Sequence, residues 1–298
     1  MMTKYALILI LLTSFLAASA GNPKEKPLLM AKGAQVTKAG GGFAFTEGPA
    51  VAPDGRVYFT DQPNDKIWIW SEKGTITTFT QISERSNGTY FNAKGELVTC
   101  ADLHNRLVAF SKDGQRRILA EGFDGKHLNG PNDLWVAPNG GIYFSDPYYF
   151  RDYWEEGHQE VQPTRGVYYL SPDGKVTRVI NDYKQPNGLI GTPDGKILYV
   201  SDIQDHKIWK YEIATDGSLR NKTFFAPEGS DGMTIDRAGN VYLTNQCVSV
   251  FNSKGENIAK IAIPEQPSNL CFGGKKRNIL FITARTSVYI LKMAIKGY

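Results

Sequence analysis

The chain has 298 residues, of which 41% are hydrophobic and 21% charged, a composition typical of a globular protein that buries a sizeable core. Its formal net charge of +4 is spread without long basic runs, so the sequence contains no patch of the kind that binds nucleic acid. Thirty glycines, fifteen tyrosines and fifteen phenylalanines favour strands and turns over helices.

The first residues have the pattern of a secretory signal peptide. Lys4 precedes an apolar run from Tyr5 to Leu12, and Ala18-Ser19-Ala20 supplies the small residues of a cleavage site. We therefore predict a signal peptide over residues 1–20 and a secreted or periplasmic mature protein that no longer contacts the membrane. The alternative is a membrane anchor, which the short apolar core disfavours.

Three cysteines follow, at positions 100, 247 and 271, each within an apolar run. None has the C-x-x-C spacing of a metal site, so we interpret them as buried structural thiols. An odd number leaves at least one cysteine outside any intrachain disulfide, and the sequence alone does not decide whether two of them pair.

A strand–turn–strand unit recurs along the chain, and its clearest copy contains Pro138-Asn-Gly-Gly141 between two apolar runs. Such turns supply the backbone conformations that a tight hairpin requires. The six copies are Glu47–Asp61, Asn87–Asp102, Asn132–Asp146, Asn187–Asp202, Asp231–Asn245 and Asn269–Ala284.

The tail of each unit adds a second hairpin, as in Lys66–Trp70 with Thr75–Phe79. Four short strands per unit and a period of roughly 40 to 55 residues are typical of propeller blades. We predict an all-β fold, a six-bladed β-propeller with four-stranded antiparallel blades, as one domain over 34–298 after a polar segment over 21–33. The last unit is one strand short, and residues 34–38 are expected to supply its outer strand.

The longest insertion, residues 147–165, follows the third unit and is rich in aromatic side chains. Long loops in compact domains are often functional, so Tyr148 and Tyr149 are candidate substrate contacts. A surface loop that packs its own aromatic side chains remains the alternative.

One polar position recurs ten residues before the start of the second strand of every unit. Because the innermost strand of each blade lines the central channel, equivalent positions form a ring around the axis. Two carboxylates and four amide oxygens in one ring suit a hard divalent cation, with Ca²⁺ preferred and Zn²⁺, Mg²⁺ or Mn²⁺ as alternatives. The ring positions are Glu47, Asn87, Asn132, Asn187, Asp231 and Asn269.

A structural explanation competes with this ring. Asn87-Gly88, Asn187-Gly188 and Asp231-Gly232 each have the composition of a tight turn. Glu47 stands in the same register, however, and a turn does not explain a glutamate there. The four aspartates that end second strands are interpreted as caps of loop backbone, and they are Asp61, Asp102, Asp146 and Asp202.

At these residues the sequence resembles the family of senescence marker protein, gluconolactonase and luciferin-regenerating enzyme. The matching motifs lie in order along nearly the whole mature chain. They are Glu47-Gly-Pro-Ala-Val51, Leu128-Asn-Gly-Pro-Asn-Asp-Leu134 with Ile142–Tyr148, Gln185-Pro-Asn-Gly-Leu189 with Pro193-Asp-Gly195, and Ser230–Asp236.

The resemblance implies a divalent cation held by Glu47, Asn187 and Asp231, with Asn132 at the metal or at the substrate. It also implies hydrolysis of sugar lactones by a carboxylic ester hydrolase, with Asp231 as the acid–base residue. Asn87 and Asn269 are further candidates for substrate binding. Where animal members have a sugar-binding arginine two residues before the matching asparagine, this chain has Gly130.

Two other functions use the same residues. A non-catalytic propeller could bind a ligand or a protein partner and keep the cation for structure alone, and an esterase could act on organophosphates. The sequence does not decide the natural substrate, the metal or the oligomeric state.

Overall fold

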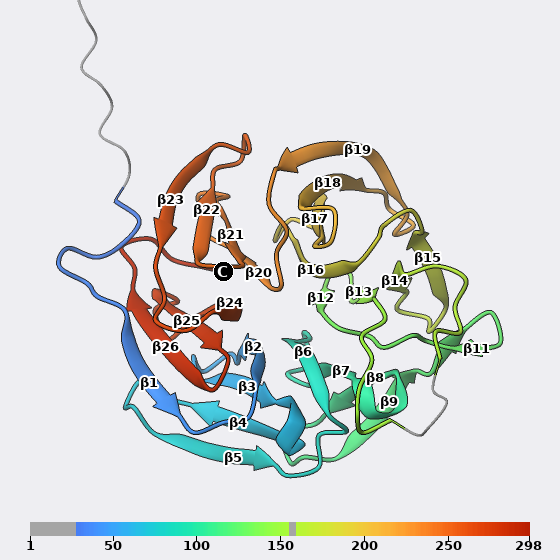
Figure 1. The fold of residues 1–298 in the computed structure, drawn as a ribbon, viewed down its shortest axis with the longest axis horizontal. Helices are drawn as coiled ribbons and strands as arrows, with labels where there is room; N and C mark the ends of the chain where they lie inside the picture. The colour runs from blue at the N-terminus through green and yellow to red at the C-terminus, as the bar shows by residue number, and fades with distance from the viewer. Residues whose placement is uncertain (1–27, 155–158) are drawn as a thin grey trace, which may run out of the picture.

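The computed structural model describes residues 28–154 and 159–298, which form six four-stranded antiparallel sheets arranged as blades around a central axis (Figure 1). This is a six-bladed β-propeller, so the predicted fold is confirmed. The predicted signal peptide lies outside the described residues. Within them, no helix has the length and apolar character needed to cross a membrane.

The innermost strand of each blade lies nearest the axis, and the second strand pairs with it (Figure 1). All six second strands begin at the residues that the repeat predicts. The innermost strands are β2 (Thr46–Val51), β6 (Ser86–Phe91), β12 (Leu134–Val136), β16 (Pro186–Gly191), β20 (Met233–Ile235) and β24 (Pro267–Gly273). The second strands are β3 (Val57–Asp61), β7 (Leu97–Ala101), β13 (Ile142–Asp146), β17 (Ile197–Asp202), β21 (Val241–Thr244) and β25 (Ile279–Ala284).

The outer half of each blade comes from the second hairpin of its unit. The third strands are β4 (Lys66–Trp70), β8 (Arg106–Phe110), β14 (Gly166–Leu170), β18 (Lys207–Ile213), β22 (Val248–Phe251) and β26 (Ser287–Lys292). The outermost strands are β5 (Ile76–Thr80), β9 (Arg116–Ala120), β15 (Val176–Ile180), β19 (Leu219–Ala226), β23 (Asn257–Ile261) and β1 (Thr37–Gly41). Short elements outside the blades are the ribbon β10 (Gly122–Phe123) with β11 (Lys126–His127) and the 3₁₀ turns η1 (Gln62–Asn64) and η2 (Asp102–His104).

The N-terminal part of the described chain closes the ring, because β1 pairs antiparallel with β26. The sequence predicts this strand over residues 34–38, but it begins at Thr37 and ends at Gly41. The closure is therefore confirmed, while the predicted position of the strand was three residues too early.

Contacts between blades explain the glycine that follows four of the ring positions. A Cβ at Gly48 would lie 2.1 Å from the backbone oxygen of Asn87, and one at Gly188 would lie 2.5 Å from that of Asp231. Gly88 and Gly232 meet the next blade equally closely. These glycines thus allow neighbouring innermost strands to approach, and the turn interpretation of these dipeptides is wrong.

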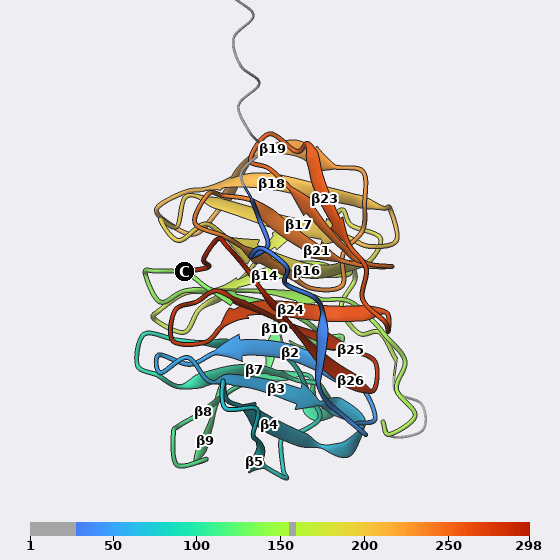
Figure 2. The ribbon, with the colours of Figure 1, turned by 90° about the vertical axis from the view of Figure 1, so that its left-hand side faces the viewer.

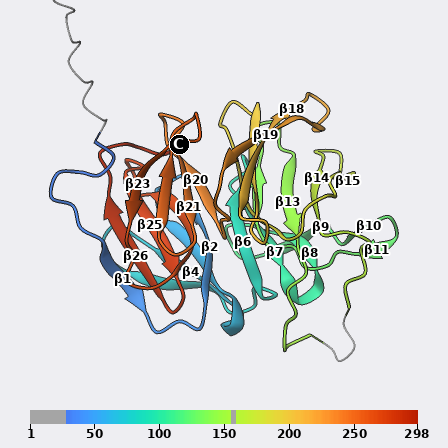
Figure 3. The same cartoon turned by 45° about the horizontal axis from the view of Figure 1, so that its top comes forward.

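The two faces of the disc differ in what covers them. The segments that flank residues 155–158, from the insertion after β13, lie on one face, and the C-terminus lies on the opposite one (Figures 2 and 3). Cys100, Cys247 and Cys271 are all unpaired. Cys100 and Cys271 are buried as predicted, whereas Cys247 is partly exposed.

Candidate active site and metal centre

The six ring positions converge on the axis because each stands at the start of an innermost strand or two residues before it. Five of the side chains are buried, and Asp231 is partly exposed. The residues predicted from the repeat are therefore brought together in one place.

Aspartates at the ends of the second strands hold the loops that lead into the ring. The Asp61 carboxylate accepts hydrogen bonds from the backbone nitrogens of Ala44 and Phe45, at 3.0 and 3.1 Å. Asp146 and Asp202 receive the same pair of backbone bonds from the residues that precede their own innermost strands. In these three blades the aspartate thus fixes the backbone that leads to the ring side chain, as the capping interpretation predicts.

Asp102 departs from this pattern and is bound by side chains of the insertion. Its Oδ2 accepts a hydrogen bond from Arg151 Nε at 2.9 Å and another from the Tyr153 hydroxyl. Its backbone oxygen accepts one from Trp154 Nε1 at 2.9 Å. The interpretation of Asp102 as an ordinary loop cap was therefore incomplete, because the repeat contains no information about the insertion.

A third carboxylate, Asp133, lies within electrostatic reach of Glu47 and Asp231. The sequence reasoning missed it. A signal was present: four blades have glycine after the ring position, whereas the third blade has this aspartate. Its Oδ1 accepts a hydrogen bond from Leu134 N at 2.9 Å, and the carboxylate also accepts one from the backbone nitrogen of Leu189 in the next blade.

The three carboxylates are costly to ionise together. Burial and the neighbouring charges of Asp231 and Asp133 raise the pKa of Glu47 well above its ordinary value. Burial, with a smaller contribution from Asp231, raises the pKa of Asp133 to about 7. Burial also raises the pKa of Asp231 to about 6, against the lowering effects of Asn187, Arg151 and Arg285. A positive charge in the ring would relieve this repulsion.

The Asn187 side chain presents a buried oxygen that could bind a cation or accept a hydrogen bond. Its Nδ2 donates a hydrogen bond to the Tyr149 hydroxyl at 2.9 Å, whereas its buried Oδ1 has no hydrogen-bond partner among the described residues. An unsatisfied buried oxygen is unfavourable unless a donor or a cation occupies the space beside it. Tyr149 of the insertion therefore contacts the ring directly, as a residue predicted to line the site would.

The other predicted ring residues form hydrogen bonds with neighbouring parts of the propeller. The Asn269 amide accepts a hydrogen bond from Leu270 N at 2.8 Å and donates to the carboxylates of Glu47 and Asp133. The backbone oxygens of Asn132 and Asn87 accept bonds from Gly88 N, at 2.7 Å, and Thr60 Oγ1, at 3.0 Å.

Tyr148 packs its ring 5.9 Å from that of Trp154, and its backbone oxygen accepts a hydrogen bond from Gln185 Nε2 at 3.1 Å. Tyr148 thus supports the insertion, while Tyr149 reaches the ring.

Two cavities bear on the site, and only the second is lined by a residue of the ring. A recess of about 700 Å³ lies between the insertion and the first two blades, beside Phe45, Arg85 and Arg151. A second cavity of about 330 Å³ follows the innermost strands along the axis, includes Asp133 and Asn269, and extends to Tyr298. The recess is therefore on the side from which the insertion can contact a bound molecule.

No group of three or more His, Cys, Asp or Glu side chains within residues 28–154 and 159–298 is arranged to hold a metal ion by itself. A metal in the ring would need amide oxygens as well as carboxylates, which is the donor set of Ca²⁺ sites rather than of structural zinc sites. Such a set is present, because Asn187 offers its oxygen between two carboxylate positions.

Comparison with known proteins identifies the family. Residues 45–286 match the family model described as the SMP-30/Gluconolactonase/LRE-like region. The chain belongs to this family. The resemblance predicted from the ordered motifs is thus confirmed.

Individual relatives agree with this assignment. A gluconolactonase of Zymomonas mobilis is 30% identical over 276 residues, which cover 82% of this chain and 77% of that protein. The solved structure of a gluconolactonase from Xanthomonas campestris is 28% identical with a TM-score of 0.82, covering 89% of this chain and 91% of that one. A calcium-binding protein, regucalcin, from Agrobacterium tumefaciens is 18% identical with a TM-score of 0.74, covers 90% of this chain and 96% of that one, and supports the fold alone.

Proposed function

We propose that this chain is a metal-dependent hydrolase that opens sugar lactones, with Asp231 as its acid–base residue. The gluconolactonase names of its relatives support the reaction class. The observation that carries the metal proposal is the buried Asn187 Oδ1, which lacks a partner among the described residues and belongs to a ring with raised carboxylate pKa values.

The residues of the ring fit a hard divalent cation. Glu47, Asn187 and Asp231 would hold it, with Asn132 at the metal or at the substrate, and Ca²⁺ is the ion that this oxygen set favours. When bound, such an ion would supply a positive charge that polarises the lactone carbonyl.

Asp231 would act on the water. As a carboxylate it removes a proton while the hydroxide oxygen bonds to the carbonyl carbon. The bond from that carbon to the ring oxygen then breaks, and the proton on Asp231 passes to the departing oxygen. The product is a hydroxy acid, and Asp231 is again ionised. Burial raises the pKa of Asp231 to about 6 in the absence of the ion, and a bound cation would lower this pKa, so Asp231 would be ionised and ready to accept the proton.

The test combines activity with metal binding. Protein treated with a chelator would be reloaded with Ca²⁺, Zn²⁺, Mg²⁺ or Mn²⁺ and assayed for acid release from a panel of aldono-lactones, after subtraction of spontaneous hydrolysis. Calorimetric titration would measure metal binding separately. We expect Asp231→Asn to lower kcat at least 100-fold, because base catalysis contributes about 10²–10⁴-fold.

The control is Asp216→Asn, which removes an exposed carboxylate remote from the ring and should leave both readouts unchanged. Unaltered hydrolysis after Asp231→Asn or after complete chelation would refute the proposal. Metal binding without turnover of any lactone would favour the non-catalytic propeller, and turnover of a phosphotriester included in the panel would favour the organophosphate esterase. Export by the predicted signal peptide remains a proposal, testable by locating the mature chain in cell fractions.

A further inference from the structure

The insertion is fastened to the second blade through Asp102, which is 2% exposed. Three side chains of one short segment, Arg151, Tyr153 and Trp154, donate hydrogen bonds to this one residue. Gly130 leaves room for the arrangement, since a Cβ there would lie 3.3 Å from the Trp154 ring. Residues 151–154 therefore have a defined position beside the recess.

Arg151 is the cation that this anchor positions. Its Nε donates to Asp102 Oδ2 at 2.9 Å, and its guanidinium carbon lies 5.6 Å from the centre of the Tyr149 ring. Its two terminal nitrogens have no hydrogen-bond partner among the described residues, and 23% of the side chain is exposed to the recess. Tyr149 in turn bonds Asn187, so Arg151 is two contacts away from the ring.

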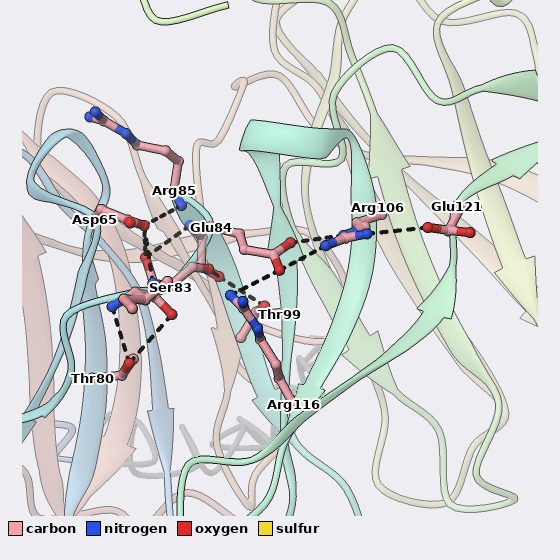
Figure 4. Close-up of polar contacts among 11 residues, drawn as sticks. Asp65, Thr80, Ser83, Glu84, Arg85, Thr99, Arg106, Arg116 and Glu121 are labelled. Atoms are coloured by element: carbon pink, nitrogen blue, oxygen red, sulfur yellow. Dashed lines mark hydrogen bonds and ion pairs between the residues drawn. The ribbon is translucent and has the colours of Figure 1, made fainter.

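Two further arginines lie near the recess: Arg85 lines it, and the Arg285 guanidinium carbon lies 5.9 Å from the centre of the Phe45 ring, which also lines it. The backbone of Arg85 is fixed by a 2.7 Å bond from its nitrogen to Asp65 Oδ1, and its side chain extends away from the buried ion pair between Glu84 and Arg106 (Figure 4). Its guanidinium lies 4.6 Å from the centre of the Tyr153 ring. Neither Arg85 nor Arg285 has a carboxylate within 4.0 Å among residues 28–154 and 159–298.

Among the described residues that line the recess, Asp152 is the only acidic one. It is exposed to solvent, and Asp102 is bonded to the insertion. A guanidinium with an unpaired edge in a partly enclosed recess matches the two oxygens of a carboxylate. A neutral hydroxyl would satisfy only part of that edge.

We propose that the lactone opened by this protein carries a carboxylate, which Arg151 binds at the recess, and that Asp102 is a positioning residue for Arg151. This rests on the proposed lactonase function. The substrate class would be a lactone of an aldaric acid, which keeps a second, free carboxylate, rather than a neutral aldonolactone.

The test compares two lactones that differ at one carbon, glucaro-1,4-lactone with a carboxylate and glucono-1,4-lactone with a hydroxymethyl group. We expect the metal-loaded protein to favour the acidic lactone at least 10-fold in kcat/KM. Arg151→Gln should raise KM for the acidic lactone about 10- to 100-fold, the range of a lost charged hydrogen-bond pair, and change KM for the neutral lactone less than 3-fold. Arg151→Lys should recover part of the loss.

Positioning by Asp102 has its own readout. Asp102→Asn should raise KM for the acidic lactone with little change in kcat, whereas general damage to the fold would alter both lactones. Arg220→Gln removes an exposed arginine of the outer strand β19 and serves as the control. Equal treatment of the two lactones by the unmodified protein, or an equal effect of Arg151→Gln on both, would overturn the proposal.

A binding measurement separates this inference from the proposed function. Calorimetric titration with glucarate and with gluconate measures how much the second carboxylate contributes to binding affinity, without any turnover. Tighter binding of glucarate that Arg151→Gln abolishes supports the inference even if no lactone is hydrolysed. Indistinguishable binding of the two acids overturns it even if hydrolysis is observed.

Discussion

Asp133 offers a direct measure of the electrostatic cost of the ring. It is 6% exposed, and its carboxylate faces the charges of Glu47 and Asp231. Replacing Asp133 with asparagine keeps the size and one of the two acceptor oxygens, and it removes one negative charge. We expect this substitution to stabilise the chelated protein at neutral and alkaline pH.

The magnitude follows from the pKa of Asp133, which burial raises from 3.8 to about 7. At 1.36 kcal/mol per pKa unit, the ionised carboxylate destabilises the folded state by about 4 kcal/mol above pH 7. The Asn269 amide would lose its acceptor on the new side chain, at a cost of about 1 kcal/mol. The expected net gain is therefore about 3 kcal/mol at pH 8.

The sign of the pH dependence is fixed by the direction of this pKa change. Between pH 3.8 and about 7 the folded state keeps a proton that the unfolded state releases, so the penalty grows as the pH rises through this window. At pH 5 the penalty has fallen to about 2 kcal/mol, and the variant should then lie within about 1 kcal/mol of the unmodified protein.

Urea unfolding of the two chelated proteins at pH 5 and pH 8, read by circular dichroism and by tryptophan fluorescence, measures this difference. Coincident transitions are needed for a free energy of unfolding to be assigned. Asp216→Asn is the matched control and should change stability by no more than about 0.5 kcal/mol at either pH. A variant that is less stable at pH 8, or a gain that does not depend on pH, would show that Asp133 contributes by its hydrogen bonds and not by its charge.

Two further outcomes are expected. Tyr149→Phe removes the hydroxyl that accepts a hydrogen bond from Asn187 Nδ2. Because groups that orient metal ligands contribute to metal binding, the Ca²⁺ affinity measured by calorimetry should fall about 10-fold. An unchanged affinity would place the ion elsewhere. Gly48→Ala should lower the free energy of unfolding, measured in urea, by at least about 3 kcal/mol, because the new Cβ meets the Asn87 backbone oxygen. Gly74→Ala, which has open space around it, should lower it by about 1 kcal/mol from its positive φ alone. Equal losses would refute the close-approach argument.

The features predicted correctly from the sequence are those that each blade repeats within itself. Hairpin turns and strand starts depend on residues close in the chain. A single alignment of the six units therefore predicted where β3, β13 and the other second strands begin, and the ring positions followed from it. The contacts that were missed join distant segments. Arg151 and Asp102 are 49 residues apart, and the link between them follows from no repeat.

Asp133 was missed for a related reason. The ring position can be read from the register, but the residue after it contacts the neighbouring blade, and only the three-dimensional packing shows that glycine is the ordinary solution there. Once the close approach at Gly48 and Gly188 is known, an aspartate at the equivalent place in the third blade stands out as a charge placed where the fold favours no side chain.

This arrangement separates the geometry of the ring from its chemistry. The approach of the innermost strands holds six side chains around the axis whatever their type, so the fold alone sets their closeness. Amides at four positions keep the number of negative charges low, and Glu47, Asp231 and Asp133 supply a charge that exceeds what the buried site tolerates without a cation. The insertion then places the Arg151 guanidinium beside the recess on one face, which gives a symmetric fold an unsymmetric site. Under the two proposals above, substrate specificity would depend on the insertion and its anchor on Asp102, and hydrolysis would depend on the ring.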